Sequence, residues 1–387
     1  MRKVAILTKY YNNYNYGGML QGYALCSVIR KLGHTCDIVS YDPANNGNPV
    51  YPNKLAQAKQ YGFTDFVSKF SERLIAKCNF RIRPLLDLRR NRFRLFMDEV
   101  AMSTKVYDDS NMNLLNSEYD AFVSGSDQIW NPNAVRNLYL QTFVDNHNLK
   151  IAYAASIGRK SFSEQESEIM IPWIKRFDYL GIREKTGTEL LSKYMDKKIE
   201  TVIDPTMLLS SEEWSSLASE RLTEKPYAVC YFFSDSSFVR EYAAKYCKIN
   251  NLELLFIPYA KQEYNLYDGK GSGKRLDDIG PKEFVSAIRN AEIVFTDSFH
   301  GAVFSIINRK SFFVFERNKE GHVSMNSRLY DLLDGFDLSD RLVSIENIER
   351  INSSETIDYD KVHIKLEAKK QQSLAYLKNA LNDNEKI

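Results

Sequence analysis

The feature that most constrains the fold is a repeated order of short apolar runs, polar loops and segments with helical spacing. Early in the sequence, residues 4–7 form an apolar run, residues 19–32 carry apolar side chains on one helical face, and residues 36–41 form a second run. Such runs are typical of strands that are covered on both faces. Because parallel strands need a crossover between them, the pattern predicts a βαβ unit.

The same order recurs in two series, which predicts an α/β fold with two domains. A chain of 387 residues is too long for one ordinary domain. The polar stretch at residues 215–226 predicts a linker. We expect a first domain at 1–214 with a helical insert at about 45–115, a second domain at 226–350, and a helical tail at 351–387. Ligands bind at the carboxyl ends of strands in such folds, so polar clusters directly after apolar runs are candidate sites.

Composition narrows the classes of function. The formal net charge is only +2, which does not indicate nucleic-acid binding. The five cysteines are scattered without a CxxC pair, so the sequence predicts neither a disulfide framework nor a metal site. The first residues lack the pattern of a signal peptide, and no run of about 18 apolar residues occurs. We therefore expect a cytoplasmic protein with reduced thiols.

A basic stretch at residues 73–94 contains eight Lys or Arg residues and one acidic residue, with apolar residues interleaved. This composition is typical of a helix that lies on an anionic membrane surface. A solvated helix, or one that packs between domains and pairs with carboxylates there, would have the same composition. Both interpretations stay open, and the first would place the protein at the inner face of the membrane.

The first polar cluster is NYNYGGMLQGYAL, residues 13–25. Gly17 and Gly18 precede the predicted helix, where glycine permits close backbone approach and the free N–H groups of the helix favour an anion or a hydroxyl. A simple turn would use the same two residues. Neither a GxGxxG pattern nor a P-loop occurs, so a nucleotide is not indicated.

The second polar cluster is VSGSDQIWNP, residues 123–132. Here Ser126, Asp127 and Gln128 follow an apolar run and precede Trp130. Several hydrogen-bonding groups beside an indole suit a sugar ligand. The structural alternative is a helix cap and a turn.

Two further clusters carry charge. Arg183 follows the apolar run in YLGIREKTG and offers a planar fork for a carboxylate or a phosphate, although an ion pair with Glu184 would also explain it. In TDSFHGAVF, Asp297, Ser298 and His300 lie between an apolar run and an apolar helix. The start of that helix would place an imidazole and free peptide N–H groups together, which suits an anion.

Six motifs taken together resemble the polysaccharide pyruvyl transferase family. They are NYGGMLQGYAL, SGSDQIWNP, YAASIG, GIREKTG, VIDPTMLL and TDSFHGAVFSI, in that order, within residues 3–335. The resemblance implies a GT-B-like fold, with two Rossmann-like domains facing across a cleft. It also implies transfer of the enolpyruvyl unit of phosphoenolpyruvate to a sugar of a surface polysaccharide or its lipid-linked precursor. The product is a pyruvate ketal, phosphate is released, and no cofactor or metal is required.

The resemblance places Arg183 and His300 on the donor-site arginine and histidine of the family. Many members carry arginine two residues before that histidine, whereas this sequence has Ser298. Arg317 and Arg328 are the replacement cations that lie nearest in sequence. The expected donor-binding residues are Arg183, Ser298, Gly301, Arg317 and Arg328.

The chemistry of the implied reaction assigns the remaining roles. Phosphoenolpyruvate must gain a proton at C3, and the attacking hydroxyl must lose one, so the site needs an acid and a base. His300 is expected to transfer a proton or to bind the phosphate, and Asp127 and Asp297 are candidates for the second proton-transfer role. Asp297 is equally suited to a helix cap. The expected acceptor-binding residues are Asn15, Tyr16, Gly17, Gly18, Gln21, Ser126, Gln128 and Trp130.

Two alternatives remain at this point. A GT-B glycosyltransferase that uses a nucleotide-sugar would have the same fold, because a fold does not determine a function. A non-catalytic glycan-binding member is the other alternative, since Ser298 replaces an arginine of the family. A homo-oligomer is one further expectation for such a protein.

Overall fold

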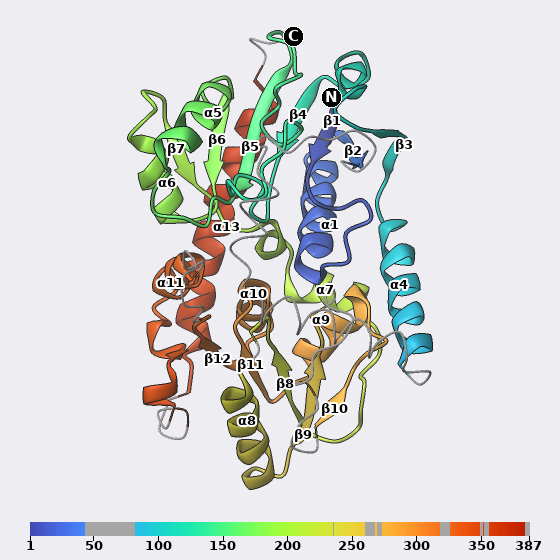
Figure 1. The fold of residues 1–387 in the computed structure, drawn as a ribbon, viewed down its shortest axis with the longest axis vertical. Coiled ribbons are helices and arrows are strands. Elements are labelled where there is room, and N and C mark those ends of the chain that lie inside the picture. Colours follow the sequence, from blue (N-terminus) through green and yellow to red (C-terminus); the bar gives the residue numbers. More distant parts are fainter. Residues whose placement is uncertain are drawn as a thin grey trace.

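The computed structural model describes residues 1–42, 82–234, 236–259, 268, 273–317, 326–348, 351 and 356–383. Two parallel sheets lie one above the other, with helices packed around them (Figure 1). The first sheet uses strands between residues 3 and 201, and the second uses strands between residues 227 and 343. The expected α/β class is confirmed, while the exact domain limits stay a prediction.

The first sheet has the strand order β3-β2-β1-β4-β5-β6-β7. Its neighbouring strands all run parallel. The strands are β1 (Lys3–Leu7), β2 (Thr35–Tyr41), β3 (Met102–Tyr107), β4 (Ala121–Ser124), β5 (Leu149–Ala155), β6 (Tyr179–Ile182) and β7 (Ile199–Thr201). The predicted βαβ unit is confirmed as β1, α1 (Tyr16–Lys31) and β2.

Local sequence explains the limits of α1. The side chain of Asn15 accepts a hydrogen bond from the Gly18 N–H and caps the first turn. Gly33 has φ of +89° just beyond the helix, in the left-handed region that glycine adopts without steric cost. The helix is buried along most of its length, which fits a crossover that covers a parallel sheet.

The second sheet has the order β10-β9-β8-β11-β12-β13 and is also parallel. Its strands are β8 (Tyr227–Tyr231), β9 (Glu253–Ile257), β10 (Lys274–Arg275), β11 (Ile293–Thr296), β12 (Ser311–Phe315) and β13 (Leu342–Val343). The remaining α-helices are α4 (Arg83–Met97), α5 (Glu164–Ile174), α6 (Lys185–Ser192), α7 (Ser211–Leu217), α8 (Ser237–Ile249), α9 (Pro281–Arg289), α10 (Phe299–Ile307), α11 (Ser327–Asp334) and α13 (Tyr359–Leu381). Short 3₁₀ helices are η1 (Met112–Ser117), η2 (Pro205–Leu208), η3 (Ser339–Arg341) and η4 (Ile345–Asn347).

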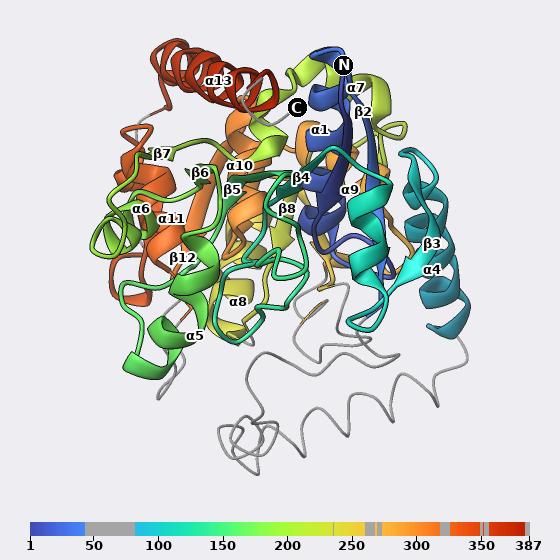
Figure 2. The ribbon, with the colours of Figure 1, turned by 90° about the horizontal axis from the view of Figure 1, so that it is seen from above.

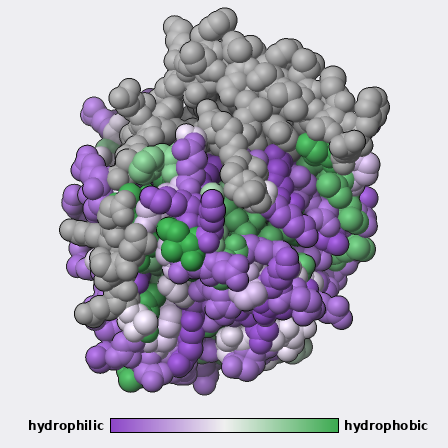
Figure 3. Space-filling model, turned by 90° about the horizontal axis from the view of Figure 1, so that it is seen from below, coloured by the Kyte–Doolittle hydropathy of each residue, from purple (hydrophilic) through white to green (hydrophobic). Residues whose placement is uncertain are grey.

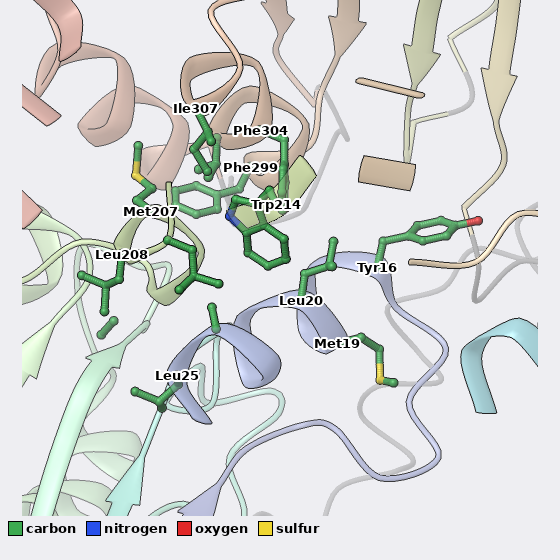
Figure 4. Close-up of a cluster of buried hydrophobic side chains, with 14 of the residues drawn as sticks. Tyr16, Met19, Leu20, Leu25, Met207, Leu208, Trp214, Phe299, Phe304 and Ile307 are labelled. Carbon is green, nitrogen blue, oxygen red and sulfur yellow. The ribbon is translucent and has the colours of Figure 1, made fainter. Parts of the chain in front are cut away.

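A continuous hydrophobic core joins the two sheets. Side chains from α1, η2, α7 and α10 meet in one cluster (Figure 4), which includes Tyr16, Met19, Leu20, Leu25, Met207, Leu208, Trp214, Phe299, Phe304 and Ile307. The Tyr16 ring stacks on Phe284 of α9 with centroids 4.8 Å apart, and its hydroxyl donates to the Ile279 carbonyl. Because this shared core is buried, the residues at the junction are held in a fixed arrangement.

The linker prediction at residues 215–226 is wrong at its start. Helix α7 runs to Leu217, with a capping box at Ser210 and Glu213. The Trp214 indole is fully buried and donates to the Thr206 carbonyl. The stretch therefore begins within a short, mostly polar helix, whose apolar residues Trp214 and Leu217 are buried in the shared core.

The basic insert is described only in part. Of the basic stretch at residues 73–94, residues 83–94 lie in α4, whereas residues 73–81 lie outside the described residues. Arg92 of α4 pairs with Asp278, 3.2 Å away, and lies 3.5 Å from Glu283 at the second sheet. The Tyr10 hydroxyl at the first sheet donates to the Phe96 carbonyl of α4. Helix α4 therefore packs against both halves, and membrane contact by the basic stretch at residues 73–94 stays a prediction.

Helix α13 begins at the second sheet and ends at the first (Figures 1 and 2). Near its start, the Tyr359 hydroxyl donates to the Ser305 carbonyl. Near its end, the Tyr376 hydroxyl donates to the Ala152 carbonyl in β5, and the Arg2 Nε donates to the Leu381 carbonyl. Figure 3 shows the molecule from below, at the end of the second sheet, where the coloured residues are mostly hydrophilic and the hydrophobic ones form small groups.

Candidate functional site

Polar side chains from separate strands meet at the junction between the sheets. Strands β4, β5 and β6 are neighbours in the first sheet, so the residues that follow them lie at one edge. Ser126 follows β4, Ser156 follows β5 and Arg183 follows β6. The start of α10, which follows β11 of the second sheet, brings His300 to the same place, as the distances below show.

Asp204 is the centre of this group. Its Oδ2 lies 2.8 Å from Arg183 Nη1, accepts a hydrogen bond from Ser126 Oγ at 3.3 Å, and lies 3.6 Å from His300 Nε2. Its Oδ1 caps η2 through Thr206. Burial opposes ionisation of this carboxyl, but the charges of His300 and Arg183 outweigh it and hold the pKa of Asp204 well below its usual range. Asp204 is therefore a buried carboxylate.

The side chain of Arg183 is fixed by hydrogen bonds, ion pairs and an aromatic ring. Besides the contacts to Asp204, its Nη2 donates to Ser156 Oγ at 3.0 Å, and its guanidinium lies 4.1 Å from the centroid of the Phe299 ring. Among the residues that the structure describes, its buried Nε has no hydrogen-bond partner, and neither does Oε2 of Glu184; the two atoms are 3.8 Å apart. The Glu184 Oε1 accepts from the N–H groups of Ile157 and Gly158. The ion-pair alternative raised by the sequence is present, and because Arg183 also borders a pocket, its role in binding an anion stays a prediction.

His300 lies in the contact between the two halves. A β-carbon on Gly17 would lie 1.9 Å from His300 Nδ1, so only glycine leaves room for the imidazole at the start of α1. His300 Nε2 is buried, lies 3.6 Å from Asp204 Oδ2 and has no hydrogen-bond partner within the described part of the chain. The imidazole is therefore placed between a carboxylate and the N-terminus of a helix.

The loop after β4 is fixed by α1. Gln21 accepts a hydrogen bond from the Ser126 N–H at 2.9 Å and donates to Thr8 Oγ1 and the Gly18 carbonyl. Asp127 and Gln128 both have φ of 55°, and Lys9 Nζ donates to the Gln128 carbonyl at 3.0 Å. This left-handed backbone turns both side chains away from the path of the strand.

Asp127 lies near several cations. Burial opposes its ionisation, yet the positive charges of His300, Arg183, Lys9 and Arg328 outweigh it and lower the pKa of Asp127. Among the described residues, none donates a hydrogen bond to its carboxylate. Asp127 is therefore an ionised group with free acceptor atoms beside the imidazole.

Arg328 is a buried cation that is 6% exposed. Its guanidinium lies 5.9 Å from the Phe299 ring centroid, and with the Gln128 amide oxygen turned toward it, Nε and Nη2 donate to that oxygen at 3.3 Å. Within the described part of the chain, no carboxylate lies at ion-pair distance from it. Burial, with repulsion from Arg183 and Arg317, lowers the pKa of Arg328 to about 9.

Arg317 and Asp297 make their hydrogen bonds to each other and to backbone groups around the second sheet. Arg317 Nε and Nη2 donate to the Asp297 carbonyl, and Nε lies 3.5 Å from Asp297 Oδ1. The two carboxylate oxygens of Asp297 accept from the N–H groups of Phe233 and Ser234. These contacts favour the structural alternative for Asp297, although the cap that it makes is on the loop after β8.

The other expected residues have structural contacts. The Ser298 hydroxyl caps α10 by accepting from the Gly301 N–H, and a β-carbon on Gly301 would lie 2.4 Å from Thr296 Oγ1. The Trp130 indole is buried against Phe177 and donates to the Tyr139 carbonyl. Asn15, Tyr16 and Gly18 shape α1 and its packing, as described above. The junction group itself therefore contains Arg183, Arg328, His300, Asp127, Gln128, Ser126 and Gly17 from the sequence prediction.

Sequence reasoning did not select Asp204, Ser156, Glu184 or Lys9 for the site. Asp204 and Ser156 follow strands directly, within the motifs VIDPTMLL and YAASIG, which is the same signal that selected Arg183. The signal was present but ambiguous, because an Asp before Pro also suits a turn or a cap. Asp204 does cap η2, with its second oxygen left for the site.

A pocket of roughly 170 Å³ opens beside this group. Its wall comes from the ends of β6 and β7 and from η2, α10, α11 and α13, and it includes Arg183, Asp204, Phe299, Arg328 and Lys369. Among the residues that the structure describes, no group of three or more His, Cys, Asp or Glu residues is arranged to hold a metal ion. No helix in the described ranges is long and apolar enough to cross a membrane.

Solved structures with the same architecture are found over the full length of the chain. MnaA from S. aureus, solved with UDP, is 11% identical with a TM-score of 0.55, over 99% of this chain and 97% of that one. A protein assigned as a UDP-N-acetylglucosamine 2-epimerase from Listeria monocytogenes is 10% identical with a TM-score of 0.54, over 98% and 96%. At this identity the likeness concerns the fold alone. Two parallel sheets with a polar junction between them, in this arrangement, define a GT-B-like protein.

The family follows from the sequence. The family model for polysaccharide pyruvyl transferase matches residues 15–319. The chain therefore belongs to the polysaccharide pyruvyl transferase family. A search of curated proteins finds no significant match.

Proposed function

We propose that the protein transfers the pyruvyl unit of phosphoenolpyruvate to a sugar of a surface polysaccharide or its lipid-linked precursor, forming a cyclic ketal. The observation that carries the proposal is Arg328, a buried guanidinium without a carboxylate at ion-pair distance among the described residues. A buried charge without a counter-charge is costly, and an anionic ligand would remove that cost. Phosphoenolpyruvate carries a phosphate and a carboxylate on a three-carbon unit.

The size of the pocket supports a compact donor. Its volume of roughly 170 Å³ is small compared with the about 300–1,000 Å³ of sites for drug-sized ligands. A nucleotide-sugar would need more space than the described pocket offers. The pocket borders the guanidinium side chains of Arg328 and Arg183, which are suited to the two anionic groups of the donor.

We assign the two proton transfers to His300 and Asp127. In the proposed reaction, C3 of the donor gains a proton and C2 forms a bond to a sugar oxygen. A second sugar hydroxyl then attacks C2 while the C2–O bond to phosphate breaks. Two hydroxyl protons are released, of which one balances the proton at C3 and the other leaves with phosphate.

Asp204 would stabilise the charged imidazole during these steps, because its Oδ2 is 3.6 Å from His300 Nε2. Asp127, ionised and with free acceptor atoms, is suited to remove a hydroxyl proton. The loop that carries Ser126, Asp127 and Gln128 would then face the acceptor sugar.

Calorimetry with phosphoenolpyruvate and with a panel of nucleotide-sugars tests the donor. We expect wild type to bind phosphoenolpyruvate selectively, and Arg328→Gln to lose that binding. Phosphate release on addition of glycan acceptors then tests turnover. Selective binding of a nucleotide-sugar would instead place the protein among glycosyltransferases, and binding of neither would favour a non-catalytic member.

A further inference from the structure

The C-terminal helix forms one wall of the pocket. Lys369, Gln372 and Ser373 of α13 border it together with Arg183 and Arg328. All three α13 residues lie beyond residue 319, where the match to the family model ends. Helix α13 therefore adds side chains to the site that residues 15–319, the segment matched by the family model, do not supply.

The position of this part of α13 is fixed. Ser373 Oγ accepts a hydrogen bond from the Ile203 N–H at 3.0 Å, beside Asp204, and donates to the Lys369 carbonyl. One turn later, Tyr376 is buried against Tyr153 and bonds to β5. A side chain on the turn before Ser373 is thus presented to the pocket by a rigid element.

Lys369 is a half-buried cation on that turn. Its Nζ lies 5.8 Å from the Phe336 ring centroid and near Gly335, and both of these residues border the pocket. Among the described residues, no carboxylate lies within ion-pair distance of Lys369. By contrast, Lys365 one turn earlier pairs with Asp337.

The carboxylates in the pocket wall are already engaged. Asp204 pairs with Arg183, and Asp331 accepts hydrogen bonds from the Thr186 N–H and Oγ1. Glu184 is bound through one oxygen to backbone amides, and its other oxygen is buried near Arg183 Nε. Arg328 and Lys369 are left as cations of the pocket wall that have no carboxylate of the described chain at ion-pair distance.

We propose that this pocket binds a compact phosphate- or carboxylate-bearing anion and that Lys369 is a binding residue for it. The identity of the anion rests on the proposed function, in which it is phosphoenolpyruvate or the phosphate released from it. A lysine is a mobile point charge with three donors, which suits a phosphate that changes position during a reaction. The C-terminal helix therefore completes the donor site from outside the segment that defines the family.

The experiment measures binding of phosphoenolpyruvate and of inorganic phosphate, separately, to the full chain by calorimetry. The variants are Lys369→Gln, the matched control Lys370→Gln, and Arg328→Gln. Lys370 is half-buried on the same helix but does not border the pocket. We expect Lys369→Gln to weaken binding about tenfold, which is the loss of one charge-assisted hydrogen bond. Lys370→Gln should bind as wild type does.

The outcomes separate the two proposals. Wild-type affinity in Lys369→Gln would overturn the role of Lys369 and leave the proposed donor standing. An equal loss in both lysine variants would also overturn it, because the effect would then be one of general charge. Binding of phosphate but not of phosphoenolpyruvate, weakened by Lys369→Gln, would support the pocket and overturn the donor. Binding of neither anion by wild type would overturn both.

Discussion

The imidazole of His300 occupies the space that a β-carbon on Gly17 would need. The two residues belong to helices that start at different sheets, so their contact fixes the approach of the two halves at the site. A side chain at either helix start that disturbed this contact would move the imidazole relative to Asp204. The packing of Gly17 against His300 therefore sets the position of the imidazole that we propose as a proton-transfer group.

Gly17→Ala should reduce turnover strongly. The new methyl group would clash with the imidazole at 1.9 Å and displace it, and a shift of about 1 Å costs about a hundredfold in rate. Steady-state kinetics of ketal formation measure the loss. If it arises from His300, the double variant Gly17→Ala/His300→Ala should be no slower than His300→Ala alone. Additive losses would show that Gly17 acts by another route.

His300→Ala should lower kcat by about 10²–10⁴-fold, the usual range for a positioned proton-transfer group. Donor affinity, measured by calorimetry, should change less than kcat. His147→Ala is the control, because that histidine is exposed and lies outside the junction group. Near-normal turnover of His300→Ala at saturating donor would refute the catalytic assignment.

Arg328→Met should stabilise the free protein while removing donor binding. Burial makes the charge of Arg328 costly, so an apolar replacement is expected to raise the free energy of unfolding by about 1 kcal/mol. The pKa of Arg328 is lowered to about 9. The folded state thus loses this proton more readily than the unfolded state. The gain in stability of Arg328→Met over wild type should therefore have its full size below pH 9 and become smaller above pH 9.

Denaturant unfolding at pH 7 and above pH 9 measures that difference. Arg317→Met is the contrasting variant, because it would leave the Asp297 carbonyl without its two donors. It should therefore destabilise the protein by about 1–3 kcal/mol. Destabilisation by Arg328→Met at neutral pH would mean that its charge is compensated in the free protein.

Asp204→Asn should destabilise the fold at neutral pH by about 3 kcal/mol, since it leaves a buried arginine without its carboxylate. The pKa of Asp204 is lowered on folding. Its contribution is therefore fully present above the unfolded pKa near 4 and is lost as the pH falls further. The gap to wild type should be largest at pH 7 and narrow below about pH 4 in urea unfolding.

The exposed Asp360 supplies the control for this experiment. Its pair with Arg309 lies at the surface, where such pairs contribute about 0–1 kcal/mol. Asp360→Asn should leave the unfolding curve nearly unchanged at every pH. If the difference in free energy of unfolding between Asp204→Asn and wild type did not depend on pH, the effect would come from altered packing or hydrogen bonding and not from the lost charge.

Much of the fold follows from local pattern. The apolar runs of β1, β8 and β11 are short and uninterrupted, so period and length identify them as covered strands. Helix α7 was not predicted from the sequence, because its seven residues are mostly polar and only Trp214 and Leu217 are buried. A helix that short is defined by its capping box and by tertiary contacts more than by periodicity.

The site was harder to predict, because its residues act through contacts between separate elements. The sequence places Trp130 beside three polar residues, but the indole faces the core. Asp297 and Asp204 both follow strands, and only the structure distinguishes them. Backbone amides occupy both oxygens of Asp297, whereas Asp204 reaches Arg183 and His300. Such differences depend on neighbours far apart in sequence.

The path of α13 has a consequence for synthesis of the protein. Residues 359–381 leave the ribosome after both sheets, yet they carry Lys369 and fasten to Arg2 and β5. A nascent chain can therefore build both sheets before the pocket has its last wall, whereas their shared core is completed only by α13, which adds Val362, Leu366 and Leu377 to it. Anion binding would reach its full affinity only once this helix has docked, so the docking step couples completion of the core to completion of the pocket.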